Sequence, residues 1–143
     1  AKQSAAGHWT TANLPASERN KRYLSMICSH VLATARESLA VAPGLREVKI
    51  AVVRDEGALR RSGRWATLLV AVIERREMEQ AVWDGRIRAE SLLSDIASAV
   101  AVRFHASSAK LMPLTANDVD GLEALTNWLD ECSTDDDAEP AAM

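Results

Sequence analysis

Two groups of basic side chains are the residues of this sequence best suited to bind an anion. The first group, at the start of a predicted helix, comprises Arg19, Lys21 and Arg22, and the second, around a predicted hairpin loop, comprises Arg54, Arg60, Arg61 and Arg64. Guanidinium groups form paired hydrogen bonds with phosphate and carboxylate oxygens. The loop therefore has two possible roles. It binds phosphate or an acidic partner, or it is a solvated loop that keeps the hairpin soluble.

The histidines and cysteines do not form a pattern typical of a metal site. His8, His30 and His105 fall in three separate predicted elements, and Cys28 and His30 project about 200° apart on one helix. The sequence contains no Gly-x-Ser-x-Gly, Gly-x-x-x-x-Gly-Lys or Gly-x-Gly-x-x-Gly motif. We therefore infer no metal, cofactor, small-molecule ligand or catalytic residue, and no motif argues for an enzyme.

A metal-dependent nuclease would have to bring Asp55 and Glu74 to one cation. These residues stand at opposite ends of the predicted hairpin, roughly 30 Å apart at about 3.3 Å per residue. That distance excludes a shared metal ion, so we assign no nuclease centre to this pair.

The rest of the chain is organised around this hairpin, with strands over residues 47–53 and 64–74 and a loop over 55–63. The first strand alternates apolar and polar residues, whereas the second is apolar on both faces. Such a strand is either central, with helices above and below, or has its second face covered by a partner chain. The partner interface would then consist of Leu68, Val70 and Val72.

Helical periodicity is strongest over residues 18–39, where apolar positions repeat at three and four residues and Ser17 is placed as an N-cap. A second long helix is predicted over 86–104, with Asp84 as its N-cap. The remaining predicted elements are a helical turn within 74–80, a short edge strand at 110–114 and a last helix of about fourteen residues that opens at 115–118.

Composition and length favour one domain, with 48% hydrophobic residues and no apolar run long enough to span a membrane. We expect a flexible arm at 1–16, a single domain at 17–132 and a disordered acidic tail at 133–143.

Residues 115–143 carry nine acids and no base, so the preceding part, with 17 bases and 11 acids, carries a net charge of +6. Cys28 and Cys132 lack the Cys-x-x-Cys spacing, which favours free thiols and a cytoplasmic location.

The predicted class is α+β, a two-layer sandwich of a small antiparallel sheet and two long helices, with a further helix at the C-terminus. The order of a helix, two strands, a helix and a strand resembles that of KH-type RNA-binding folds, including ribosome-binding factor A. The resemblance is one of topology only. The Gly-x-x-Gly loop with which KH domains hold a nucleic-acid backbone is absent, so no residue is carried over.

Two functions follow as hypotheses. The first is a non-catalytic interaction module that forms a homodimer or docks a protein partner through the apolar face of the hairpin. The second is nucleic-acid binding by the basic body, moderated by the acidic C-terminus.

Overall fold

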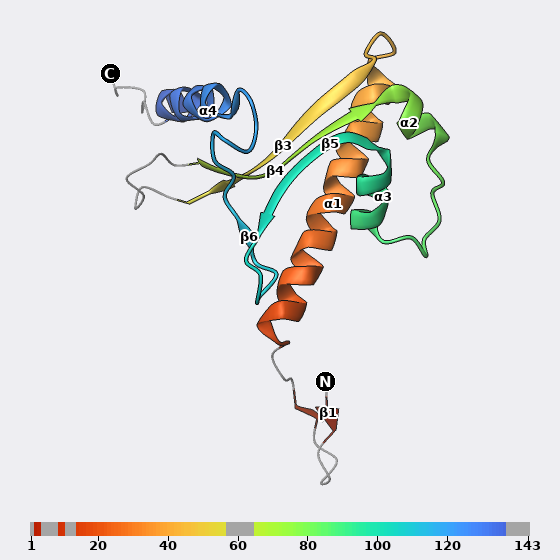
Figure 1. The fold of residues 1–143 in the computed structure, drawn as a ribbon, viewed down its shortest axis with the longest axis vertical. Coiled ribbons are helices and arrows are strands. Elements are labelled where there is room, and N and C mark those ends of the chain that lie inside the picture. The colour runs from red at the N-terminus through yellow and green to blue at the C-terminus, as the bar shows by residue number, and fades with distance from the viewer. Residues whose placement is uncertain (1, 4–8, 11–13, 57–64, 137–143) are drawn as a thin grey trace, which may run out of the picture.

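The computed structural model describes residues 2–3, 9–10, 14–56 and 65–136, and it confirms an α+β fold. A four-stranded antiparallel sheet has the order β3-β4-β5-β6, so each strand pairs with the next along the chain. Figure 1 shows α1 and α3 together along the sheet, with α4 set apart from them. The bounds are β1 Lys2–Gln3, β2 Trp9–Thr10, α1 Ala16–Val41, β3 Glu47–Asp55, β4 Trp65–Glu74, α2 Arg75–Gln80, α3 Ala89–Ile96, β5 Ala97–Phe104, β6 Leu111–Met112 and α4 Leu122–Asp136.

The predicted first helix is confirmed as α1, and its apolar stripe packs onto the sheet. Its buried residues are Ile27, Cys28, Val31, Leu32, Ala35 and Leu39. The N-cap prediction was wrong, because Pro15 occupies that position and Ser17 lies inside the first turn. The Arg19 amide donates to the Pro15 carbonyl at 3.0 Å as the first bond of the helix, and no side chain caps this end.

The predicted long helix over residues 86–104 was wrong beyond its first half. The chain forms the short helix α3 and then, from Ala97, the strand β5. A helix over 86–104 would bury Leu92, Leu93, Ile96, Val100 and Phe104 on one stripe; the first three are buried, whereas Val100 and Phe104 are exposed. Because β5 pairs with β4, β4 is a central strand of the sheet. Asp84 is not an N-cap either: its carboxylate accepts the Arg86 amide, and α3 begins after Arg88.

The second face of the sheet is partly covered by the segment that leads into α4. Val70, Leu114 and Leu122 form a small buried cluster there, separate from the main core under α1 and α3. The segment is held by the Leu114 amide, which donates to the Thr67 carbonyl at 2.8 Å. Hydrogen bonds from Thr115, aided by Arg103, hold the pKa of the Asp118 carboxyl below its ordinary value.

The shorter elements agree with the sequence except at their ends. α2 is the expected helical turn, and β6 is the expected edge strand before Pro113. The last helix begins at Leu122 rather than near residue 115 and extends to Asp136, into the stretch expected to be a tail. The remaining tail residues, 137–143, and most of the expected N-terminal arm lie outside the described residues.

None of the helices formed by the described residues is long and apolar enough to cross a membrane.

Candidate functional site

The predicted interface residues do not form one exposed face. Leu68 is 0% exposed and belongs to the main core, and Val70 is 4% exposed beneath the start of α4. Only Val72 is half-buried. The prediction that Leu68 and Val70 form a docking surface was therefore wrong, because the same chain already buries them: Leu68 lies in the core under α1 and α3, and Val70 packs with Leu114 and Leu122.

A β-bulge explains the position of Leu68. Val52 pairs with Leu69 but Val53 pairs with Thr67, so Leu68 is an extra residue of β4 without an opposite partner. A bulge turns the side chains that precede it relative to those that follow. Leu68 therefore joins Leu69 in the core under α1 and α3 and does not share the face of Val70.

The basic residues are not brought together as one anion site. Arg22 forms an exposed ion pair with Glu18 at 3.0 Å, and Arg54 pairs with Glu56. Arg19 and Lys21 lie exposed in the first turns of α1. The other predicted members, Arg60, Arg61 and Arg64, lie outside the described residues. Thus, of the four predicted anion-binding residues that the structure describes, two already have a carboxylate partner.

Among the described residues, no group of His, Cys, Asp or Glu is arranged to hold a metal ion. His30 is exposed on α1, and His105 lies beside the Ser107 and Ser108 hydroxyls. Cys28 is buried in the core. Burial raises the pKa of the Cys28 thiol to about 11, and the nearby charge of Glu90 adds to this rise.

Cys28 should therefore react slowly with alkylating agents in the native protein. With a pKa of about 11, about one thiol in a thousand is ionised at pH 8, against about one in ten at the ordinary value of 9.0. We expect iodoacetamide to modify native Cys28 about 100-fold more slowly than in the urea-unfolded chain, measured by mass spectrometry of its peptide. Equal rates in the two states would show that the thiol is neither buried nor shifted.

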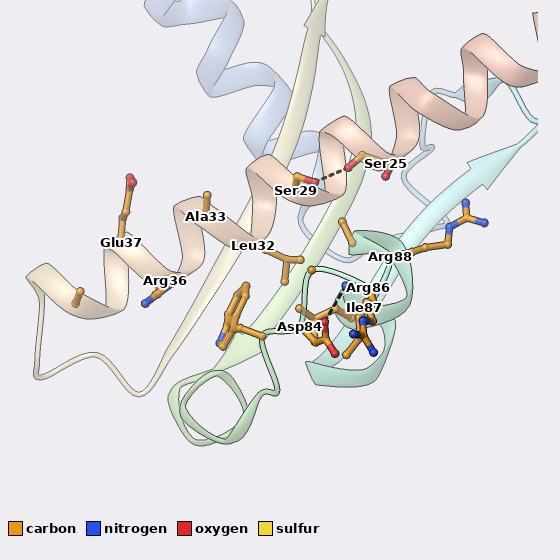
Figure 2. A pocket seen from close by; sticks show the side chains of 15 residues that line it. Ser25, Ser29, Leu32, Ala33, Arg36, Glu37, Asp84, Arg86, Ile87 and Arg88 are labelled. Atoms are coloured by element: carbon orange, nitrogen blue, oxygen red, sulfur yellow. Dashed lines mark hydrogen bonds between the residues drawn. The ribbon is translucent and has the colours of Figure 1, made fainter.

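A wide groove of about 850 Å³ lies between α1 and the loop that precedes α3. Figure 2 shows Leu32 and Arg36 of α1 on one side and Asp84 and Arg86 of the loop on the other. The Arg36 guanidinium lies over the Trp83 ring, 5.4 Å from its centroid. The Ser29 hydroxyl donates to the Ser25 carbonyl of the same helix. No nucleophile and base meet among the groove's lining residues, so this groove offers no catalytic arrangement.

A second groove, of about 530 Å³, runs between α1 and β3, and we call it the edge groove. Its α1 wall comprises Tyr23, Met26, Ile27, His30, Val31 and Thr34, and its β3 wall comprises Ile50, Ala51 and Val52. No other strand contributes to it, because β3 is the outermost strand of the sheet. Within the part of the chain that the structure describes, the edge groove therefore follows a strand that has a neighbour on one side only.

Comparison of the chain with protein-family models, with curated proteins and with solved structures found no match.

The hydrogen bonds of β3 show which backbone groups face its open side. The Arg75 amide donates to the Arg46 carbonyl at 2.7 Å, and these two residues stand opposite each other in the register of the hairpin. Antiparallel pairs alternate between bonded and non-bonded, so even-numbered residues of β3 bond to β4. The amides and carbonyls of Lys49, Ala51 and Val53 consequently point toward the open edge.

Large apolar side chains flank this open edge on both faces of the sheet. On the α1 side, Tyr23 is 38% exposed and Met26 is 48% exposed. On the other side, α4 places Trp128, which is 58% exposed, in a cleft lined also by Ala51 and Val53. We call the outward backbone groups of β3 and these three side chains the β3 edge site. Sequence reasoning missed this site, because β3 has the alternation of an ordinary half-buried strand.

Proposed function

We propose that this chain is a non-catalytic, cytoplasmic interaction domain that binds another polypeptide as an added strand along β3. The observation that supports this proposal is the edge groove, in which outward backbone groups of β3 lie beside the exposed apolar side chains of α1. Strand addition of this kind derives its affinity from main-chain hydrogen bonds and its specificity from alternate side-chain contacts. The hairpin thus stays the binding element, but with its outer edge in place of the buried face.

The central part of β3 lacks the usual protection of an edge strand. Natural edge strands carry charges, prolines or bulges that prevent pairing with other chains. Residues 50–53 read Ile-Ala-Val-Val and contain none of these, and the bulge of the hairpin lies on β4. A nine-residue strand with such a centre is suited to pair with a further strand.

Nucleic-acid binding receives no comparable support, because Arg22 and Arg54 already form ion pairs within the chain. It enters the test of the proposal as the competing outcome.

The test compares two substitutions at the edge with one outside it. Ala51→Pro removes an outward amide while leaving the hydrogen bonds to β4 in place, and Met26→Glu puts a charge into the edge groove. Both should reduce the protein retained from a nuclease-treated lysate by tenfold or more, with cross-links from the wild type mapping to 23–34 and 47–55. Val82→Glu, at a side chain that is 69% exposed outside the groove, should leave retention unchanged.

Circular dichroism and thermal unfolding establish that each variant is folded, and Met26→Glu stands alone if Ala51→Pro unfolds. Folded edge variants that retain as much protein as the wild type would exclude the β3 edge site. Retention that disappears with nuclease treatment in the wild type itself would favour the nucleic-acid hypothesis instead.

A further inference from the structure

The β3 edge site has the charge distribution of an interface centre with a charged rim. Residues 23–35 of α1 contain no Asp, Glu, Lys or Arg, although Tyr23, Met26 and His30 are exposed. The facing part of β3, residues 50–53, is uncharged as well. Charged residues begin again at both ends, in 19–22 and 36–37 of α1 and at 49 and 54–55 of β3. Interfaces between proteins characteristically lack charge at the centre and are polar at the rim.

The sequence of β3 is also complementary to itself. Two copies of β3 that pair antiparallel about a two-fold axis place residues of equal parity opposite each other, on the same face. An axis at Ile50 would oppose Arg46 and Arg54, and an axis at Ala51 would oppose Glu47 and Asp55, so both registers bring like charges together.

An axis at Val52 avoids these repulsions. It places Lys49 of each copy opposite Asp55 of the other, twice by symmetry, and it pairs Ala51 with Val53. An axis at Val53 would oppose no charges of either sign within the described part of β3. The Lys49 ammonium has three donors, and its contact with the Asp120 carbonyl, at 3.5 Å, leaves two for such a carboxylate. Exposed ion pairs add little affinity, so this pair sets the register while the apolar centre supplies the binding.

The same register makes use of the outward backbone groups. Ala51 and Val53 of the two copies would form hydrogen-bonded pairs, whereas Val52, whose backbone bonds to β4, would face its copy as a non-bonded pair. Tyr23 and Met26 on one face, and Trp128 on the other, would then be buried beside the joined strands.

We infer that the polypeptide bound at the β3 edge site is β3 of a second copy of this chain, antiparallel and centred on Val52, so that the two sheets become continuous. This inference rests on the proposed function and names its partner.

A cysteine scan along β3 tests the inference directly. In the proposed register the two Val52 Cα atoms lie about 4.5 Å apart, within the range of a disulfide, whereas the two Ile50 Cα atoms lie more than about 13 Å apart. Under mild oxidation Val52→Cys should give a covalent dimer, and Ile50→Cys and the wild type should give at least tenfold less. Mass spectrometry of the linked peptide excludes disulfides through Cys28 or Cys132.

Sedimentation equilibrium of the wild type and of charge variants measures the dimer without introducing a cysteine. The wild type should be a dimer at micromolar concentration, Lys49→Asp should weaken it roughly tenfold, and Lys49→Asp with Asp55→Lys should restore it. Preferential linkage through Ile50→Cys, or failure of the double variant to recover, would overturn the register. A strictly monomeric wild type without linkage would overturn the second copy as the partner. If the wild type is monomeric but Met26→Glu retains less protein from the lysate than the wild type does, the proposed function would still be supported, with a different polypeptide as the partner.

Discussion

Replacing Leu68 with alanine is expected to lower the free energy of unfolding by about 2–5 kcal/mol. Leu68 is fully buried among side chains of the main core, so its truncation leaves a cavity beneath α1 and α3. Urea denaturation monitored by tryptophan fluorescence and circular dichroism measures the change.

Val72→Ala provides the matched control, because both residues lie on β4 and were predicted to share one face. Val72 is only half-buried, so its truncation should cost about 1 kcal/mol or less. If the two substitutions cost the same, Leu68 would not be a core residue, and the bulge between the pairs of Val52 and Val53 would be wrong.

The position of Leu68 illustrates what a pattern of alternation can and cannot predict. The sequence indicates that β4 is apolar on both sides, and in the structure β4 is a central strand with one face in the main core and the other partly covered by the segment that leads into α4. Which side chains share a face depends on register, and one inserted residue moves every side chain beyond it to the other face. Two successive leucines at 68 and 69 give no local signal for such an insertion.

The prediction of one long helix from Arg86 to Phe104 was wrong for a different reason. Leu92, Leu93 and Ile96 satisfy helical spacing, and the alanines and valines that follow fit either a helix or a strand. What decides between them is β4, whose open edge requires a strand beside it. Local spacing cannot report this requirement, because it depends on a segment more than twenty residues earlier in the chain. α1, by contrast, is predicted well, since its long stripe is consistent with helix alone.

The candidate site was less predictable than the fold. The edge groove exists because α1 lies beside β3 and no strand among the described residues follows on that side, and both facts are properties of the assembled sheet. The sequence does contain one usable signal, namely the absence of charge over residues 23–35 of a helix whose other parts are charged. On a helix with an exposed face, such an absence is typical of the centre of a protein interface, which is the role proposed for the β3 edge site.

The largest effect of a single polar side chain is expected at Arg75, which the sequence places in a charged segment without a particular role. Its Nη2 donates to the carbonyls of Leu39 at 2.7 Å and Ala42 at 2.9 Å, and its Nε donates to the carbonyl of Leu45 at 2.8 Å. Two of these acceptors are carbonyls at or just beyond the end of α1, where a helix leaves its last carbonyls without intrahelical partners, and the Ala42 carbonyl also accepts the Leu45 amide at 3.0 Å. Arg75 thus ties the end of α1 and the turn before β3 to the end of β4.

Arg75→Ala should lower the free energy of unfolding by about 2–3 kcal/mol, because it removes several charge-assisted hydrogen bonds from partly buried carbonyls. Arg76→Ala is the matched control, since this neighbour is exposed, and it should change stability by about 0.5 kcal/mol or less. Arg75→Lys should recover only part of the loss, because one ammonium cannot reproduce the planar array of the guanidinium. Hydrogen exchange should quicken at the Ala42 amide, which donates to Ser38 in the last turn of α1. Equal stability of the Arg75→Ala and Arg76→Ala variants would show that the three carbonyls are satisfied by water as well as by Arg75.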